Sequence, residues 1–340
     1  MSPNGQRYFA AVEAASRSGV VEVSLSTGKV RRIEKFASPI KNSADGQTST
    51  TPEVTIDELS FDGRWLVWTQ QRQLAAGTAT TTVMAWDSAS GDLWSIAGPL
   101  SDSLILVEGQ AKASGLIAWG EYPKGSSRPI HFQLYSLRTR HSTAVLEAPH
   151  ATQGGAAFFW QRTLLFDVVG SSAAEAKWHL EATAVSTVKP VAVPAELRDL
   201  RGDFTFRASS DYVVAYQQRG GSKGSKPRPA HFTTRVLRRG SARPLKLTNF
   251  TAMLVVPGSP FGDYLTWQEW TTSSGPSMFV GDLVSGAYAK FPGPGKSGRD
   301  VLAALGGGST LLAEGPLGSM GYPFAVLHLN RLTSLGNCGG

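Results

Sequence analysis

The chain alternates short apolar segments with polar turns, and the clearest unit runs from Val54 to Ile96. It begins with the alternating segment 54–61 (VTIDELSF), turns at Asp62-Gly63 and continues into the apolar segment 64–71 (RWLVWTQQ). A polar loop, the segment 81–87 (TTVMAWD), a turn at 88–91 (SASG) and a short segment 92–96 (DLWSI) follow. The two-residue period and the turn residues between the segments predict four strands in about 45 residues.

The same order of segments recurs along the chain. Because no segment shows a 3.6-residue apolar period, we expect helices to be nearly absent. Second segments such as 66–68 (LVW) and 117–119 (IAW) are continuously apolar, as strands covered on both faces are. Repeats of this length with four strands each predict an all-β, seven-bladed β-propeller that forms one domain over residues 1–340. Six blades is the alternative, and the seven copies span approximately residues 1–35, 54–97, 104–146, 155–193, 203–248, 251–291 and 300–336.

Two segments carry a family resemblance. Residues 2–12 (SPNGQRYFAAV) and 60–68 (SFDGRWLVW) resemble the S-P-D-G repeat of TolB-type β-propellers, although Phe61 replaces the proline of that repeat. The segments 23–28 (VSLSTG) and 281–286 (GDLVSG) resemble its later turn, whereas copies four, six and seven lack the Asp-Gly turn. The resemblance implies an architecture and no particular function, because such repeats occur in binding modules and in enzymes.

The first copy is expected to be incomplete. Residues 2–5 resemble the turn between first and second strands, so this copy should lack its innermost strand, and the tail after Leu335 is too short to supply it. We therefore expect that an upstream segment with a signal or anchor has been lost and that the protein is exported. No apolar run approaches about eighteen residues, so no transmembrane helix is expected.

Positive charge is concentrated in the fifth copy. The chain holds 33 Lys and Arg against 26 Asp and Glu, a net charge of +7. Between Tyr212 and Gly262 there is no acidic residue but nine basic ones: Arg219, Lys223, Lys226, Arg228, Arg235, Arg238, Arg239, Arg243 and Lys246. This stretch predicts either an anionic partner or a solvated face. Nucleic acid is the less favoured partner, because the cations divide between the two ends of the strands.

Long loops gather at one end of the predicted blades. They cover residues 72–79, 122–130, 219–230, 271–276 and 315–322, together with the connection 36–53, whereas the turns at the other end are short. Long loops on a rigid scaffold commonly carry binding function. The candidate ligand-binding residues are the cations Lys124, Arg128, Lys223, Lys226 and Arg228 and the aromatic residues Trp178 and Trp270, which suit stacking on sugar rings.

Nearly every copy ends its second strand with a polar residue. These predicted ring residues are Glu13, Gln70, Glu121, Asp167, Gln217, Glu269 and Glu314. Carboxylates and amides around a channel mouth could hold a divalent cation or bind a polar ligand. The alternative is structural, with each side chain bonded to the backbone of the adjacent blade.

Three histidines follow the repeat as well. His131, His179 and His231 lie six residues before the last residue of their third strands, and two of them share the signatures RPIHF (128–132) and RPAHF (228–232). Such residues could serve as a catalytic base or bind zinc or manganese. Equivalent positions in neighbouring blades should lie more than roughly 10 Å apart, whereas metal ligands lie about 2 Å from the ion. We therefore expect that these histidines do not share a metal ion and that the protein has no cofactor. The one exception considered is a divalent cation bound by the predicted ring residues.

These features predict a non-enzymatic recognition propeller that binds a protein or glycan ligand on the long-loop face. The alternative is a polysaccharide lyase or hydrolase that acts on an acidic glycan, with His131, His179 or His231 as base and Lys223–Arg228 binding substrate carboxylates. A third hypothesis is polyanion or nucleic-acid binding through the fifth copy. The single cysteine, Cys338, excludes an intrachain disulfide and a cysteine-based metal site.

Overall fold

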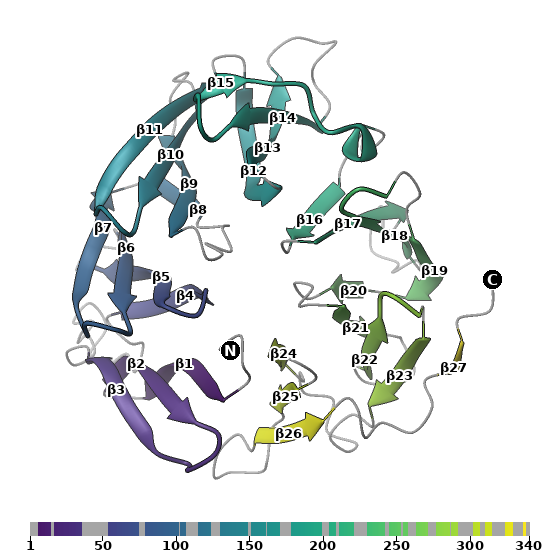
Figure 1. The fold of residues 1–340 in the computed structure, drawn as a ribbon, viewed down its shortest axis with the longest axis horizontal. Coiled ribbons are helices and arrows are strands. Elements are labelled where there is room, and N and C mark those ends of the chain that lie inside the picture. Colours follow the sequence, from purple (N-terminus) through teal and green to yellow (C-terminus); the bar gives the residue numbers. More distant parts are fainter. Residues whose placement is uncertain are drawn as a thin grey trace, which may run out of the picture. The chain divides into compact units, whose positions relative to one another are not determined.

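The protein is described by a computed structural model in which the strands form seven sheets (Figure 1). The structure describes residues 6–14, 17–35, 54–74, 79–101, 103–106, 115–123, 130–148, 151–160, 162–170, 178–198, 204–208, 211–220, 230–241, 245–252, 254–257, 263–270, 277–285, 287–291, 302–306, 310–314, 324–328 and 336–337. Regular structure in these ranges is all β apart from one 3-10 turn, η1 (Ala195–Leu197), which confirms the expected scarcity of helices.

Sheets A to C and most of sheet D lie in one compact unit, formed by Met1–Ala176 and Glu181–Val191. Sheet A contains β1 (Arg7–Ala14), β2 (Arg17–Ser24) and β3 (Val30–Lys35). Sheet B contains β4 (Val54–Phe61), β5 (Trp65–Gln73), β6 (Ala79–Asp87) and β7 (Leu93–Ser101). Sheet C contains β8 (Ser103–Leu106), β9 (Leu116–Pro123), β10 (Ile130–Ser136) and β11 (His141–Ala148), and sheet D contains β12 (Ala151–Trp160), β13 (Thr163–Gly170), β14 (Trp178–Ala184) and β15 (Lys189–Pro190).

Sheets E to G lie in a second compact unit, formed by Lys177–Leu180 and Ala192–Gly340. Sheet E contains β16 (Phe204–Ala208), β17 (Tyr212–Gly220), β18 (Ala230–Arg238) and β19 (Leu245–Ala252). Sheet F contains β20 (Leu254–Pro257), β21 (Tyr264–Trp270), β22 (Ser277–Asp282), β23 (Ala287–Phe291) and β27 (Gly336–Asn337), and sheet G contains β24 (Leu302–Gly306), β25 (Thr310–Glu314) and β26 (Phe324–His328).

One backbone hydrogen bond recurs at the short-turn end of six sheets. The amide that follows the third strand donates to the carbonyl that precedes the second strand, as Ser88 does to Arg64 at 2.9 Å. The corresponding pairs are Leu25 to Gln6, Leu137 to Gly115, Val185 to Arg162, Arg239 to Asp211 and Leu283 to Asp263. We call this bond the turn bond, and it provides a common origin from which equivalent residues can be counted.

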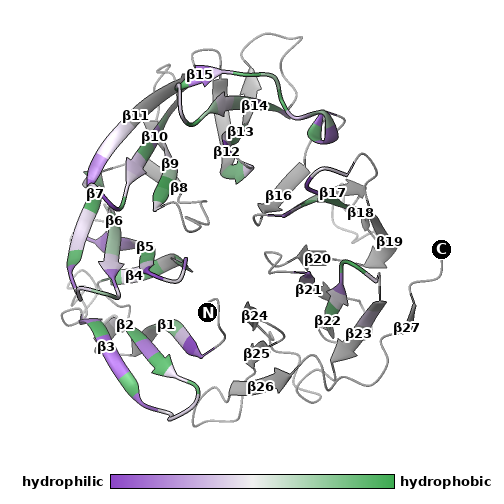
Figure 2. Ribbon diagram, viewed as in Figure 1, coloured by the Kyte–Doolittle hydropathy of each residue, from purple (hydrophilic) through white to green (hydrophobic). Residues whose placement is uncertain are grey.

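Sheet A contains three strands among the described residues. Its turn bond joins Gln6 and Leu25, so β1 has the place in this sheet that the second strand has in sheets B to F. Figure 2 shows hydrophilic residues along β3, the outermost strand of this sheet, whose burial pattern is mostly exposed. The segment 332–335, predicted as the last strand of copy seven, lies outside the described residues, and the tail pairs instead with sheet F, where Gly336 lies opposite Tyr288.

The hydrophobic cores lie between successive sheets. Each of the four described clusters takes its side chains from two neighbouring sheets, because alternate residues of a strand face opposite sides. Between sheets A and B, Phe9 and Val20 pack on Leu66 and Trp68. Between sheets B and C, Trp65 packs near Trp119 and Tyr135. Similar clusters join sheet C to sheet D and sheet E to sheet F.

Candidate functional site

A polar pair recurs at the end of the strands that lies away from the short turns. Its second-strand member lies six residues after the carbonyl of the turn bond, and its third-strand member lies six residues before the amide. Each second-strand member is opposite an apolar residue of the first strand: Ile56, Ile105, Phe204 or Val255. The pairs are Gln70 with Thr82, Glu121 with His131, Gln217 with Thr233 and Glu269 with Ser277, in sheets B, C, E and F.

Sheet B shows the environment of this position in side-chain detail. Residues Trp65 to Thr69 of β5 are buried, Gln70 is partly buried, and the residues beyond it are exposed. Gln70 Oε1 is buried and accepts no hydrogen bond from the described residues. The indole N–H of Trp68 is also buried and donates no hydrogen bond to them. Because Trp68 and Gln70 are two residues apart on β5, both side chains lie on the face of this strand that packs against sheet A. Both atoms are buried, so an unpaired donor and an unpaired acceptor lie inside this seam, and the exposed residues beyond Gln70 are the part of β5 that a ligand can contact.

Four of the seven predicted ring residues share this register, namely Gln70, Glu121, Gln217 and Glu269. Asp167 lies five residues after the turn-bond carbonyl, and Glu13 lies seven residues after it, so both are one position away from the others. Glu314 is opposite Leu302 and Phe324 in sheet G. Of the seven, Gln70 is the one whose side chain the structure describes.

The register separates the three histidines. His131 and His179 both lie six residues before the turn-bond amide, whereas His231 lies eight residues before it. His131 is opposite Glu121 in the second strand, and His231 is opposite Arg219. His179 is partly buried near the start of β14 and has interactions of its own. The two histidines that share the R-P-x-H-F signature therefore occupy different positions in their sheets.

The predicted loop cations lie outside the described residues, namely Lys124, Arg128, Lys223, Lys226 and Arg228. Trp178 is the first residue of β14, and Trp270 is the last residue of β21. Both tryptophans thus stand at the long-loop ends of their strands, and their side chains are outside the described part of the chain.

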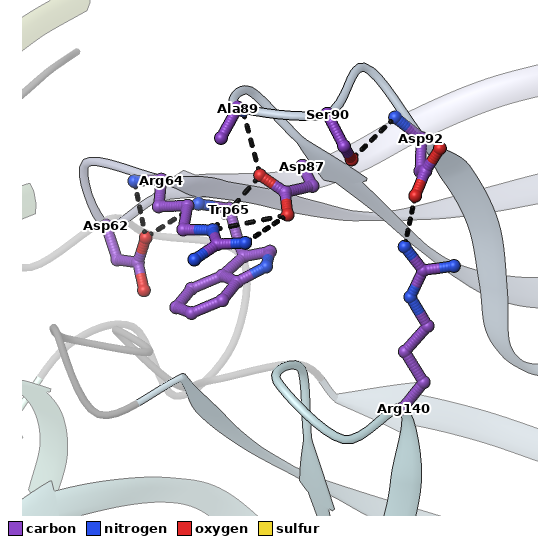
Figure 3. A network of polar contacts seen from close by, with 8 residues as sticks. All are labelled: Asp62, Arg64, Trp65, Asp87, Ala89, Ser90, Asp92 and Arg140. Atoms are coloured by element: carbon purple, nitrogen blue, oxygen red, sulfur yellow. Dashed lines mark hydrogen bonds and ion pairs between the residues drawn. The ribbon is translucent and has the colours of Figure 1, made fainter.

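The opposite, short-turn end carries a polar network that binds its own members together (Figure 3). Asp62 Oδ1 accepts hydrogen bonds from the backbone amides of Arg64 at 2.9 Å and Trp65 at 2.8 Å. The Arg64 guanidinium lies over the Trp65 ring and donates to Asp87 Oδ2 at 2.7 Å, and this hydrogen bond holds the pKa of Asp87 below its usual value. These groups hold the two turns of sheet B in place, so the network has a structural role. The long-loop end therefore remains the candidate site.

One carboxyl group escaped the sequence analysis because it lies in a mostly exposed outer strand. Glu34 of β3 is opposite Val20 of β2, so it lies on the face of sheet A that packs against sheet B. Its Oε2 atom is buried without a hydrogen-bond donor in the described ranges, and burial raises the pKa of Glu34 from 4.5 to about 7. Glu34 therefore titrates near neutral pH.

Neither a metal centre nor a membrane-spanning helix occurs within the described ranges. No group of three or more His, Cys, Asp or Glu side chains there is arranged to hold a metal ion. No helix in the same ranges is long and apolar enough to cross a membrane.

Comparisons with known proteins identify a fold class. No protein-family model matches the chain, and no curated protein matches it. Among solved structures, the chain is similar to the β-propeller domain of the trilobed protease from Pyrococcus furiosus, with 9% identity, 81% of this chain and 82% of that chain covered and a TM-score of 0.54. It is similar to an oligogalacturonate lyase from Vibrio parahaemolyticus, with 9% identity, coverage of 96% and 88% and a TM-score of 0.58. TolB from Acinetobacter baumannii matches with 12% identity, coverage of 95% and 77% and a TM-score of 0.49.

These likenesses show the fold alone. The chain is an all-β protein with the fold of β-propellers, as the repeat in the sequence predicted. Because that fold occurs in proteases and lyases alike, the activity has to be argued from the site.

Proposed function

We propose that the protein is a seven-bladed, TolB-type β-propeller over residues 1–340 that serves as a recognition module and binds a polar ligand, foremost a glycan, at the long-loop end of its blades. Sheets A to G would be the seven blades. The proposal assigns no chemical reaction to this end of the molecule.

The observation that supports this function is the recurring polar pair. In four sheets it lies at the same distance from the turn bond, where the buried part of the second strand ends in sheet B. A glycan presents many hydroxyl groups, each able to donate and accept, and the partly exposed amide side chain of Gln70 is of a type that can pair with such groups. A row of such positions would bind a polyhydroxylated chain more tightly than an apolar one.

The remaining predicted residues complete this interpretation. Trp178 and Trp270 begin and end strands beside the long loops, where they would stack on sugar rings. Lys124, Arg128, Lys223, Lys226 and Arg228 would bind carboxylates of an acidic glycan. A protein segment with exposed acidic and hydroxyl side chains is the other ligand of this class.

Binding of the purified protein to a panel of neutral and acidic oligosaccharides tests the proposal. We expect retention of at least one glycan, weaker retention by Gln70→Leu and Trp270→Ala, and unchanged retention by Ser90→Ala, which alters the short-turn end. Retention of no glycan, or equal loss in Ser90→Ala, would contradict glycan recognition at the long-loop end.

A polysaccharide lyase acting on an acidic glycan is the second candidate. It is favoured by the common register of His131 and His179, which puts an imidazole at one position of two neighbouring sheets. His179, which is partly exposed, could act as the base that removes a proton next to a substrate carboxylate. Release of unsaturated products, followed by ultraviolet absorbance, would establish the lyase, and full activity of His179→Ala would dismiss this base.

Polyanion binding through the fifth copy has less support. Arg238 and Arg239 are exposed at the short-turn end of sheet E, whereas Arg219 lies near the opposite end of β17. These cations therefore do not form one stripe along the sheet.

A further inference from the structure

Sheet D keeps at its short-turn end a cation that sheet B neutralises. The turn bond of sheet D joins the carbonyl of Arg162 to the amide of Val185, so Arg162 has the position that Arg64 has in sheet B. In sheet B the residue before the turn-bond amide is Asp87, which pairs with Arg64 at 2.7 Å. The equivalent residue of sheet D is Ala184, which carries no charge. The exposed Arg162 therefore lacks the carboxylate that its counterpart has, and it forms no ion pair with the described residues.

The turn that follows the third strand of sheet D contains a strained valine. Val188 has a φ of 54°, which a β-branched residue rarely adopts. Its amide donates to the carbonyl of Ala184 at 2.9 Å, and Gly28 and Gly91 make the equivalent bond in the turns of sheets A and B. Glycine adopts this conformation without a steric cost. The side chain of Val188 is exposed, so burial does not compensate for the strain.

Sheet C shows what a side chain at this turn position can do. Arg140 has a φ of 58°, and its amide donates to the carbonyl of Ser136 in the same way. Its guanidinium pairs with Asp92 of sheet B and lies over the Trp94 ring, 4.4 Å from the centroid. The side chain at this position thus contacts an element outside its own sheet. Strain retained at the exposed Val188 indicates a contact of this kind with a partner.

The residues around Val188 are exposed and carry no negative charge. Residues 186–192 are all exposed, and the segments 151–166 and 182–195 contain no aspartate or glutamate. Lys189 is opposite Ala184, and the amide of Val191 donates to the carbonyl of Ala182. Two cations and two apolar side chains therefore gather at this end of sheet D, and we call them the sheet D patch: Arg162, Val188, Lys189 and Val191.

We propose that the sheet D patch docks an acidic protein segment that carries an apolar side chain near its carboxylates. The guanidinium of Arg162 can bind a carboxylate through two hydrogen bonds, and the ammonium of Lys189 provides a second positive charge. Val188 and Val191 add exposed apolar surface, which favours a protein over a polyanion without apolar groups. Because the patch lies at the short-turn end, the proposal does not rest on glycan recognition at the opposite end.

Selection of random peptides displayed on phage against the immobilised full chain tests the proposal. Soluble Arg162→Glu protein is added in excess as a competitor, so that peptides which do not need Arg162 are removed. We expect the enriched peptides to combine aspartate or glutamate with apolar residues. A synthetic copy of the most enriched peptide should bind Arg162→Glu and Lys189→Glu about tenfold more weakly than wild type, and added salt should weaken its binding to wild type.

Arg32→Glu is the matched control for charge. Arg32 is exposed on β3 of the same compact unit, and the change alters the net charge as much as Arg162→Glu does. This variant should bind the peptide like wild type. Val188→Gly separates docking from folding, because it removes both the strain and the side chain. We expect it to bind the peptide more weakly than wild type and to melt no lower.

Three results would overturn the proposal. The first is a selection in which no peptide, or none with acidic residues, is enriched over the competitor. The second is equal affinity of the peptide for Arg162→Glu and Arg32→Glu. The third is retention of heparin, or of vesicles that contain phosphatidylserine, through Arg162 and Lys189 when no peptide is enriched, because the partner would then be a polyanion or a membrane surface.

Discussion

The phenol of Tyr212 in sheet E donates a hydrogen bond of 2.8 Å to Oδ1 of Asp263 in sheet F. Tyr212 is also part of the apolar cluster between these sheets, so the bond secures the short-turn end of a buried seam. Burial, followed by the hydrogen bond to Asp263, raises the pKa of Tyr212 to about 12.

Tyr212→Phe removes this bond and keeps the ring. We expect the free energy of unfolding to fall by about 1.5–3 kcal/mol, the usual contribution of a hydrogen bond to a charged group. Urea denaturation measures it. Tyr264→Phe is the control, because the Tyr264 hydroxyl has no hydrogen bond in the described ranges; an equal loss in both variants would assign the effect to something other than this bond.

Glu34→Gln should change how stability depends on pH. The pKa of Glu34 is raised from 4.5 to about 7 by burial, so the folded state keeps a proton that the unfolded state releases. Wild-type stability should therefore fall as the pH rises from 4.5 to about 7, by an amount that partial exposure of the side chain limits. Glu34→Gln should lack this decrease and melt higher than wild type at about pH 8.

The matched comparison for Glu34 is Glu22→Gln. Glu22 pairs with Arg7 and Arg31, so its neutralisation removes attraction and should not raise the melting temperature at about pH 8. Parallel melting curves of wild type and Glu34→Gln across the whole pH range would contradict the role of Glu34.

Arg64→Met should abolish an acid-sensitive contribution to stability. The hydrogen bond from Arg64 lowers the pKa of Asp87 below 3.8, so the pair stabilises the fold above the unfolded value and loses this effect as the pH falls through the lowered pKa. The stability difference between wild type and Arg64→Met should be present at neutral pH and shrink in acid. Arg138→Met, a change of an exposed arginine without a partner in the described residues, should show no such pH dependence.

Gly115→Ala should destabilise the seam between sheets B and C. Gly115 has a φ of 66°, and a Cβ atom there would lie 2.9 Å from the Trp65 ring. We expect a loss of about 1–3 kcal/mol in urea denaturation, from backbone strain and crowding together. Gly91→Ala is the control, because Gly91 has a φ of 82° and open space around it, so that the change tests backbone strain alone. An equal loss of stability in both variants would show that crowding against Trp65 contributes nothing.

Gln70→Leu should stabilise the fold while it weakens ligand binding. The change removes a buried carbonyl oxygen that has no donor in the described part of sheet B, so a gain of about 1 kcal/mol is expected. Chemical denaturation and glycan retention measure the two effects. A destabilised Gln70→Leu would indicate that Oε1 has a partner in the folded protein and would argue against its role as a ligand acceptor.

Strand positions followed well from local pattern. The apolar second strands and the Asp-Gly and SASG turns of sheet B appear where alternation and turn chemistry placed them, because both signals are local. The predicted strand 188–193 shrinks to Lys189–Pro190, since Pro190 and Pro194 cannot donate to a ladder. The pairing of Gly336–Asn337 with β23 joins distant segments, and no local pattern indicates it.

The candidate site could be predicted only in part. Counting from the last apolar residue made His231 equivalent to His131, whereas β18 continues through Arg238 and moves the turn bond to Arg239. Likewise, the pairing of β10 with β11 passes through a bulge after Leu134, which shifts the partners of the residues on the two sides of it. Register of this kind is set by tertiary packing and cannot be read from residue spacing.

The placement of the cores between sheets determines how this chain can be dissected. Each described cluster is completed by two successive sheets, so a fragment cut between sheets B and C would expose Trp65 and Val67 on one piece and Trp119 on the other. Such fragments would expose apolar surface and would tend to aggregate when expressed alone. The turn 88–91, between two strands of one sheet, is a better position for new termini or an inserted reporter. A change there keeps all sheets in one molecule, so each apolar cluster can still be completed.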